Sequence, residues 1–362
     1  MDEKEQNYQK EHFKMIERIE SYLTKGNHPI NGTDDDDEYE YHSILQFWKS
    51  VGILSFQSIT NNVDTTTTKS ISLSSSSTSS SLLTQDQDQD LDLDQDSCQW
   101  YEQASDHYED QPATLQGMLG GFASLSPHDL SSSKTFLLHI QKYIKPNITF
   151  ESICDCGAGI GRITKGLFAK LSGFEKCDLV EGSFMFLKQA EEYLKKDTSI
   201  DFTIIAVNDQ QQQQQQPLHN TKKLPQCRLI NKGLQDFVPQ SKYYNIIWIQ
   251  WVIGYLTDYD CIQFLKRCAK GLTTNGIICI KDNMIASHYG DTTTTNHNDD
   301  DPSKAFIFDK EDSSVTRSKA YLEALMDEAG SWTKIYEQRQ EGFPKEIFPV
   351  WMMAYEVKHD SI

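Results

Sequence analysis

Short apolar runs alternate with amphipathic stretches across residues 150–284. The apolar runs predict strands within SICDC (152–156), CDLVEG (177–182), CRLINKGLQDF (227–237), YYNIIWIQWVIGYL (243–256) and NGIICIKDNM (275–284). The amphipathic stretches predict helices within GRITKGLFAKLSG (161–173), SFMFLKQAEEYLKK (183–196) and DYDCIQFLKRCAKGL (258–272). Strands that are separated by helices indicate a parallel sheet with right-handed crossovers.

The C-terminal part of the chain continues this pattern. Residues 313–330 predict a helix, and residues 331–340 and 350–357 predict two strands close enough to pair antiparallel. The predicted fold is therefore α/β, with a seven-stranded, mostly parallel sheet and helices on both faces. Most S-adenosylmethionine-dependent methyltransferases of class I share this arrangement.

Low-complexity tracts divide the chain. One tract, rich in Ser, Thr, Asp and Gln, fills most of the first hundred residues, and we expect residues 1–97 to be a largely disordered extension. Two further tracts, at about 208–226 and 286–304, fall between predicted elements and are expected to be loop insertions. Residues 98–362 would then form the single folded domain.

Composition narrows the classes of partner. The chain has 362 residues and a formal net charge of −19, so we expect no nucleic-acid partner. No apolar run is long enough to span a membrane, and the polar N-terminus does not resemble a signal peptide. The eight cysteines form no C-x-x-C pair and the histidines show no metal-ligand spacing. We therefore expect reduced thiols, no metal, and a protein of the cytoplasm that could also enter the nucleus.

Three glycines follow the first strand of the alternating region, in CDCGAGIGR (154–162). Gly157, Gly159 and Gly161 suggest a loop on which a nucleotide-type cofactor lies close to the backbone. Asp155 precedes them, and its charge would repel a pyrophosphate but could receive an ammonium group. S-adenosylmethionine, which carries an amino acid and no phosphate, therefore fits better than NAD. A structural glycine turn or another nucleotide remains an alternative.

Further cofactor contacts are expected where later strands end. Glu181 follows the second strand at the position for ribose hydroxyls, although it could instead be a solvated helix-cap acid. Arg162 would face the donor's carboxylate, with a plain surface arginine as the alternative. We expect the other contacts to come from Gly182, Ser183, Gly233, Leu234, Gln235 and Gln250.

Polar residues from three more segments are expected at the same edge of the sheet, where the strands end. Trp251 follows Gln250, and Asp282 and Asn283 end the next strand. Asp309, Asp312 and Ser314 precede a predicted helix, where they could also serve as caps. Carboxylates beside a sulfonium would suit an amine substrate. For Trp251, packing in the core is the main alternative.

A series of segments resembles the protein α-N-terminal methyltransferases, which modify chains that begin Xaa-Pro-Lys or Xaa-Pro-Arg. The matching segments, in chain order, are LQGMLGGF, LSSSKTFL, DCGAGIGRITK, KGLQDF, IIWIQWVIG, FLKRC, GIICIKDNM, EDSSVTRS and YEQRQEGFPKEIFPV. The resemblance spans residues 98–358 apart from the inserts, and residues 1–97 have no clear counterpart in it. It implies S-adenosylmethionine as donor, S-adenosylhomocysteine as product, and protein N-termini as substrates.

The resemblance also implies roles for single residues. Asp312 would orient the amine and accept its proton, and Asn283 would bind the first peptide residue. Trp251 would pack on the proline, and Asp309 with Ser314 would read the cation at the third position. Further substrate contacts would be Leu119, Gly120, Asp282 and Ile347.

Three positions depart from the family pattern. Tyr255 stands where the family has a histidine, Phe348 where it has a tyrosine, and Tyr108 where it has a tryptophan, with Trp48 as the rival for that last position. All three are expected to contact the substrate. These changes leave the reaction class in place but bear on rate and degree of methylation. The alternatives are a small-amine methyltransferase, a donor-binding protein without catalysis, and an NAD-dependent dehydrogenase.

Overall fold

A computed structural model describes residues 3–35, 39–54, 95–196, 202–206, 224–285 and 303–358. The helices are α1 (Glu3–Lys25), α2 (Ile44–Ser50), α3 (Gln95–Asp110), α4 (Leu115–Met118), η2 (Ala123–Leu125), α5 (Ser126–His139), η3 (Ile140–Ile144), α6 (Arg162–Gly166), η4 (Phe168–Lys170), α7 (Phe184–Lys195), η5 (Ile253–Tyr255), α8 (Asp258–Gly271) and α9 (Lys319–Ala329). The strands are β1 (Gly32–Asp34), β2 (Glu40–Tyr41), β3 (Ser152–Cys156), β4 (Lys176–Glu181), β5 (Thr203–Ala206), β6 (Gln226–Asn231), β7 (Tyr244–Gln250), β8 (Leu272–Asn283), β9 (Phe306–Asp309), β10 (Ser314–Arg317), β11 (Trp332–Arg339) and β12 (Val350–Val357).

The main sheet has the order β11-β12-β8-β7-β3-β4-β6-β5. Pairing is parallel from β8 to β5, and β12 runs antiparallel to both β8 and β11. The predicted α/β class and the antiparallel C-terminal pair are confirmed. The predicted count of seven strands is wrong, because β5 adds an eighth strand.

The extra strand comes from the short apolar segment that precedes the glutamine-rich tract. Thr203–Ala206 pairs with Gln226–Leu229 of β6 and forms the edge of the sheet. Its hydrogen-bonding partner follows the low-complexity tract, so only the tertiary pairing identifies it as a strand. The predicted insert at 208–226 therefore separates two adjacent strands and overlaps the first residue of β6. Most of this insert, and most of the predicted 286–304 insert, lie outside the described residues.

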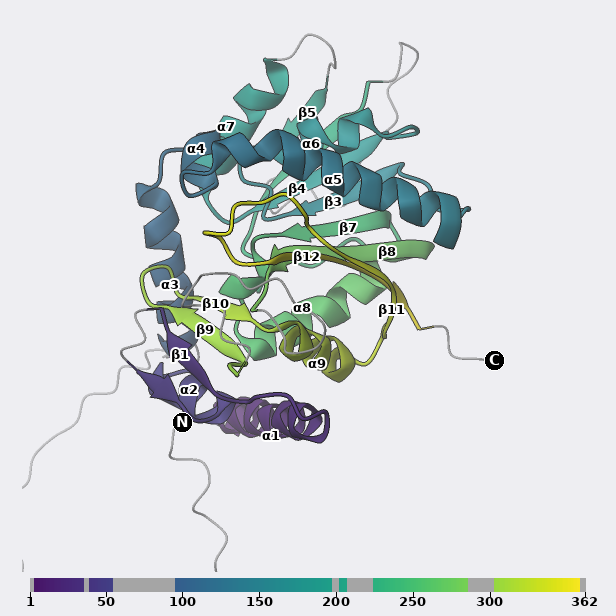
Figure 1. The fold of residues 1–362 in the computed structure, drawn as a ribbon. Coiled ribbons are helices and arrows are strands. Elements are labelled where there is room, and N and C mark those ends of the chain that lie inside the picture. Colours follow the sequence, from purple (N-terminus) through teal and green to yellow (C-terminus); the bar gives the residue numbers. More distant parts are fainter. Residues whose placement is uncertain are drawn as a thin grey trace, which may run out of the picture.

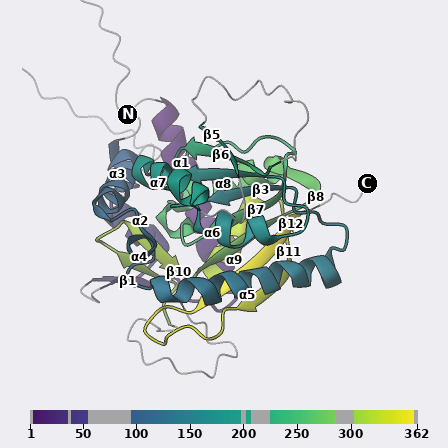
Figure 2. The same ribbon diagram turned by 90° about the horizontal axis from the view of Figure 1, so that it is seen from above.

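Helices cover both faces of the sheet, as predicted. Figure 1 shows α5 and α6 on one face and α8 and α9 on the other. The alternation in β7 explains this arrangement, because Ile246 and Trp248 belong to the core beneath α5 while Ile247 and Ile249 belong to the core beneath α8. α3 and α4 lie together at one end of the sheet in both views (Figures 1 and 2).

The prediction that residues 1–97 contribute no packed core is wrong for the described part of this segment. α1 packs against α9 and buries Met15, Ile16, Ile19 and Leu23. Phe47 and Trp48 of α2 are both fully buried in the core that also contains α8 and α9. α3 begins at Gln95, so it crosses the predicted boundary at residue 98. Residues 55–94 lie outside the described residues.

A second, smaller sheet has the order β10-β9-β1-β2. The sequence did not indicate it, because β1 pairs in parallel with β9, a strand from the opposite end of the chain. β9 and β10 form an antiparallel pair whose turn carries Asp312. Within the part of the chain that the structure describes, no helix is long and apolar enough to cross a membrane.

Candidate active site

A cavity of about 730 Å³ lies beyond the ends of β3, β4 and β7, in the size range of small-molecule sites. The predicted residues that line it are Tyr108, Leu119, Gly157, Gly159, Arg162, Glu181, Gly182, Ser183, Gly233, Leu234, Gln235, Gln250, Trp251 and Tyr255. The predicted residues outside this lining are Gly120, Gly161, Asp282, Asn283, Asp309, Asp312, Ser314, Ile347 and Phe348. The structure thus gathers nearly all predicted donor contacts, while most predicted peptide contacts lie beyond the cavity wall.

Two glycines bring the backbone to the cavity because a side chain would not fit. Gly157 and Gly159 have φ of 68° and 53°, in the left-handed region. A Cβ on Gly157 would lie 2.7 Å from Cβ of Val252, and a Cβ on Gly159 would collide with Sδ of Met118. Gly161 instead begins α6 at φ 78° and faces Leu179, so its role is in the helix start.

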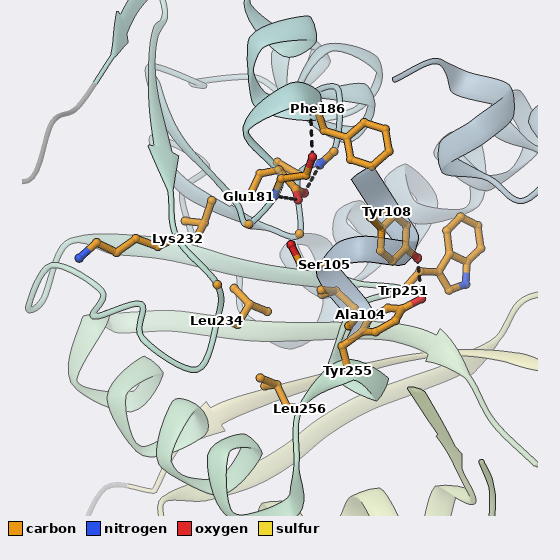
Figure 3. A pocket seen from close by; sticks show the side chains of 18 of the residues that line it. Ala104, Ser105, Tyr108, Glu181, Phe186, Lys232, Leu234, Trp251, Tyr255 and Leu256 are labelled. Carbon is orange, nitrogen blue, oxygen red and sulfur yellow. Dashed lines mark hydrogen bonds between the residues drawn. The ribbon is translucent and has the colours of Figure 1, made fainter. Parts of the chain in front are cut away.

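Glu181 contacts the glycine loop directly. Its Oε2 accepts a hydrogen bond from the Gly159 backbone N–H at 2.8 Å, and its Oε1 accepts one from the Ser183 N–H at 2.9 Å. Burial raises the pKa of this carboxyl. Ser183, through its own side chain, caps α7. Glu181 is therefore a cavity-lining acceptor, and the alternative of a solvated cap is wrong (Figure 3).

The loop that holds Leu234 and Gln235 is fixed by a residue that the sequence did not single out. Arg267 of α8 donates to the Leu234 carbonyl at 2.9 Å and to the Gln235 carbonyl at 2.7 Å. Leu234 itself is buried at the cavity wall. The apolar side chain and the exposed edge of its loop suit a flat ring such as adenine.

Arg162 is buried, so the alternative of a surface arginine is wrong. Its Nη1 lies 2.6 Å from Oδ2 of Asp129, and its guanidinium carbon lies 5.5 Å from the centre of the Trp251 ring. Nε of Arg162 is buried and has no hydrogen-bond partner among the described residues. A buried donor at the cavity wall that lacks a partner can bind a carboxylate. The amino-acid part of S-adenosylmethionine carries such a carboxylate.

Asp129 and Lys281 form the buried centre of this cluster, and neither was predicted from the sequence. Nζ of Lys281 lies 2.6 Å from Oδ1 of Asp129, and Nε2 of Gln250 donates to the same oxygen at 3.0 Å. Burial would raise the pKa of Asp129, but the charges of Lys281 and Arg162 outweigh it and lower that pKa. A lysine within the apolar run IICIKDN was the available signal, because a charge there must be paired.

Asp155 lines the cavity at the end of β3. Its Oδ2 accepts from the backbone N–H and the hydroxyl of Thr164, at 3.2 and 2.6 Å. Burial raises the pKa of Asp155 to about 6, while these two bonds oppose the rise. The side chain therefore ties the loop to α6 and keeps a second oxygen for other donors.

A chain of three side chains leads from the cavity to Asp312. The hydroxyls of Tyr108 and Tyr255 lie 2.5 Å apart (Figure 3), and the Tyr255 hydroxyl donates to Oδ2 of Asp312 at 2.8 Å. Burial raises the pKa of both tyrosines, so both hydroxyls stay protonated at neutral pH. Oδ1 of Asp312 is buried and has no partner among the described residues. The Tyr255 hydroxyl therefore holds the Asp312 carboxylate.

Asp309 and Ser314 flank the turn that carries Asp312. Oδ1 of Asp309 accepts from the backbone N–H groups of Glu311 and Asp312, at 2.8 and 3.4 Å. Ser314 pairs with Asp309 across β9 and β10, and the cap of α9 is Ser318 instead. Burial, together with the Asp312 charge, raises the pKa of Asp309. Asp309 therefore shapes the turn. That it also binds the cation at the third position of the peptide stays a prediction.

Asp282 supports the segment after β7. Its Oδ2 accepts from the backbone N–H groups of Val252 and Ile253, at 3.2 and 3.3 Å, and its Oδ1 accepts from the Asn283 N–H at 2.8 Å. Burial raises the pKa of Asp282 to about 6, and these bonds oppose the rise. The carboxylate is occupied by backbone donors, so Asp282 positions the turn.

That turn holds Trp251 in an uncommon conformation. Its φ is 54°, in the left-handed region that bulky side chains rarely adopt. The ring is partly exposed and lines the cavity, so the alternative of core packing is wrong. Strain of this kind persists when the surroundings enforce it, and the Asp282 bonds to the next two residues do so.

The remaining predicted residues do not line the cavity. Asn283 ends β8 and pairs with Val350, while Ile347 and Phe348 are partly buried in the segment between β11 and β12. Phe343 of the same segment, which the sequence analysis missed, lies 6.5 Å from Trp251, ring centre to ring centre. Gly120 has a φ of 51° in the turn after α4.

The fold and the cavity together define a class of protein. Parallel strands, a glycine loop with an acidic residue at the end of the next strand, and a buried arginine that fits a carboxylate are the features of a class I S-adenosylmethionine-dependent methyltransferase. The unpartnered Nε of Arg162 fits the carboxylate of that cofactor.

Comparison with known proteins places the chain more closely. A family model described as AdoMet-dependent proline di-methyltransferase matches residues 96–356. "Alpha N-terminal protein methyltransferase 1" of Dictyostelium discoideum is 40% identical over 264 residues, which cover 72% of this chain and 80% of the relative. "N-terminal Xaa-Pro-Lys N-methyltransferase 1" of Xenopus tropicalis is 37% identical over 264 residues, with 72% and 96% covered.

A solved structure agrees with these sequences. The S-adenosylmethionine-dependent methyltransferase of Leishmania major superposes with a TM-score of 0.62 at 27% identity and covers 91% of this chain and 97% of its own. The chain belongs to the family of AdoMet-dependent proline di-methyltransferases. S-adenosylmethionine is therefore its methyl donor, as the glycine loop predicted, and the dehydrogenase alternative is wrong.

Proposed function

We propose that this enzyme methylates the α-amino group of proteins whose N-terminus reads Xaa-Pro-Lys or Xaa-Pro-Arg. The names of its relatives support this substrate class. The observation that carries the proposal is the pair formed by Tyr255 and Asp312, which places a carboxylate with one unpartnered buried oxygen beside the wall of the donor cavity. An amine is a substrate that such an oxygen can bind and deprotonate.

The donor side of the cavity has a residue for each part of the cofactor. Arg162 would hold the carboxylate, Glu181 the ribose hydroxyls, and Leu234 the adenine. S-adenosylmethionine supplies an electrophilic methyl group on a sulfonium when it is bound. Tyr108 and Trp251 line the same cavity, and their aromatic faces favour positive charge.

The substrate side has to position a neutral amine and collect one proton. A free α-amine has a pKa of about 7.7–8.0, so a useful fraction is neutral near pH 7 without a strong base. Asp312 accepts the amine's hydrogen bond at Oδ1 while Tyr255 holds Oδ2, so the carboxylate cannot rotate away. Methyl transfer is an in-line displacement, and this alignment supplies much of its acceleration. The proton that leaves the amine is taken up at Asp312.

The second and third residues of the peptide would contact the other residues at this edge of the sheet. Trp251 would pack against the proline ring, and Asn283 would donate to the first carbonyl. Asp309 and Ser314 would face the cation at the third position, and their place at the ends of β9 and β10 supports this role. We place the activity in the cytoplasm and, for nuclear substrates, in the nucleus.

Mass spectrometry of peptides tests the proposal. The enzyme and S-adenosylmethionine should add methyl groups to a peptide that begins Ser-Pro-Lys, and fragment ions should place them on the first residue. The same peptide with an acetylated N-terminus should remain unmodified, because its nitrogen has no available lone pair. Methylation of the lysine in the acetylated peptide would refute an N-terminal site. A control peptide with alanine in the second position tests the proline requirement.

A further inference from the structure

The N-terminal segment contacts the part of the molecule that carries Asp312. The family model matches residues 96–356, and the described residues 3–35 and 39–54, here called the added segment, lie before it. The added segment is not a separate unit. β1 lies between β2 and β9 in the smaller sheet, and Figure 1 shows it beside β9 and β10. The sheet that bears the Asp312 turn is therefore built partly from the added segment.

β1 pairs with β9 and adds a third strand to the hairpin formed by β9 and β10. Gly32 pairs with Phe306 and Asp34 with Phe308, both in parallel register. Within the described part of the chain β9 and β10 belong to no other sheet, and a hairpin of two strands is only marginally stable by itself. β1 pairs with the edge of β9 that β10 leaves open. This pairing restricts the motion of the turn between β9 and β10.

An ion pair connects β1 to the turn itself. Nζ of Lys310 lies 3.1 Å from Oδ2 of Asp34, whose side chain is fully buried. Lys310 is two residues from Asp312, and its carbonyl accepts a hydrogen bond from Gln103 of α3 at 2.5 Å. The turn is thus held from two sides, one of which is the added segment.

Trp48 connects the added segment to Tyr255, the other half of the Tyr255–Asp312 pair. Its Nε1 donates to Oδ2 of Asp258 at 2.7 Å. Arg317, at the end of β10, donates to Oδ1 of Asp258 and to the Leu256 carbonyl, at 2.9 and 2.8 Å. Trp48 therefore supports the junction between β10 and the residue that follows Tyr255.

We propose that β1 (Gly32–Asp34) and Trp48 of α2 form a positioning element for the peptide site, which holds Asp312 in register with Tyr255. This inference rests on the proposed function and adds a determinant outside the residues that the family model matches. None of these residues lines the donor cavity. The element should therefore govern peptide binding and turnover, and donor affinity should not depend on it.

A single substitution separates β1 from β9. A Cβ on Gly32 would lie 2.5 Å from the Phe306 carbonyl oxygen and 2.7 Å from its ring, so Gly32→Val forces the strands apart. We expect kcat/KM for the Ser-Pro-Lys peptide to fall about 10- to 100-fold, because small misplacements of catalytic groups have effects of this size. The affinity for S-adenosylmethionine by calorimetry should stay within about twofold of the wild type. Thr24→Val, on the exposed face of α1, is the matched control and should change neither quantity.

Hydrogen exchange adds a readout that does not depend on the substrate. Amide exchange should accelerate in residues 306–317 of Gly32→Val and not in the main sheet. If it accelerates everywhere, or if the folded variant keeps wild-type kcat/KM, the proposal is wrong. If the wild-type enzyme leaves the peptide unmodified, the proposed function fails, and the exchange experiment still decides whether β1 holds the turn.

A milder pair of variants covers the case in which Gly32→Val does not fold. Asp34→Asn and Lys310→Gln each remove one charge of the ion pair between β1 and the turn. If the pair positions Asp312, both variants should raise the peptide KM or lower kcat, and the double variant should be no worse than either alone. Additive losses would mean that Lys310 acts on the peptide by itself, and unchanged kinetics would mean that the contact is only structural. Either result overturns the proposal.

Discussion

Replacement of Tyr255 by phenylalanine tests whether the hydroxyl that contacts Asp312 takes part in the reaction. The substitution deletes one oxygen and with it the 2.8 Å bond to Oδ2 of Asp312 and the 2.5 Å contact with Tyr108. A hydrogen bond to a charged group contributes about 1.5–3 kcal/mol. If that energy is needed only when the amine reacts, kcat/KM for the peptide should fall about 10- to 150-fold, since about 1.4 kcal/mol corresponds to a factor of ten.

The assay is initial-rate methylation of the Ser-Pro-Lys peptide by mass spectrometry, with donor affinity measured by calorimetry. Tyr244→Phe is the matched control. It removes a hydroxyl that donates at 2.5 Å to buried Asp178, at the opposite end of β7 from Gln250. The control should lose stability and keep kcat/KM. Wild-type kcat/KM in Tyr255→Phe, or an equal loss in both variants, would refute the reasoning. Full additivity with Asp312→Asn would show that the two side chains do not act together.

Three other predictions follow from buried groups of the site and of the N-terminal segment. Glu181→Ala should weaken S-adenosylmethionine binding about 10- to 150-fold in calorimetry, through loss of charge-assisted bonds of about 1.5–3 kcal/mol, and should lower the melting temperature because the Gly159 and Ser183 N–H groups lose their acceptor. Gly159→Ala should also reduce donor binding, because the left-handed φ of 53° costs about 1–2 kcal/mol and the new methyl group meets Met118; wild-type affinity would contradict the predicted loop geometry. His12 is fully buried without a hydrogen-bond partner among the described residues, and burial lowers its pKa to about 4 against the opposing charge of Asp258. The unfolded chain, with a pKa of about 6.5, takes up this proton first, so stability is complete above about pH 6.5 and falls by about 3 kcal/mol towards pH 4. Urea unfolding should show a steeper loss over this range for the wild type than for His12→Phe, and equal slopes would exclude His12.

The sequence by itself determined the class of fold and the donor loop. The continuous apolar runs of β7 and β8 are a local property, because a strand between two helical layers has to be apolar on both faces. Gly157, Gly159 and Glu181 were identified for the same reason, since each meets a requirement of backbone or charge at the end of a strand. These requirements do not depend on the rest of the chain.

Only the tertiary structure decided which distant residues meet. Nothing local distinguishes β5 or β1 from other short segments of the chain, because each is identified as a strand by its partner, which for β1 lies at the other end of the chain. Asp129 appears in the sequence as an ordinary acidic residue near a helix start, and only folding brings Lys281 and Arg162 to its two oxygens.

Residues 3–54 show the same limit most clearly. Their polar composition and the tract that follows them predicted an extension without a core. The few apolar residues of α1 and α2 are buried because α9 and β9 provide the complementary surface. Burial is a property of two surfaces together, and a sequence read along one segment contains only one of them. The contact of Tyr255 with Asp312 arises in the same way, since η5 and the β9–β10 turn come together only in the folded chain.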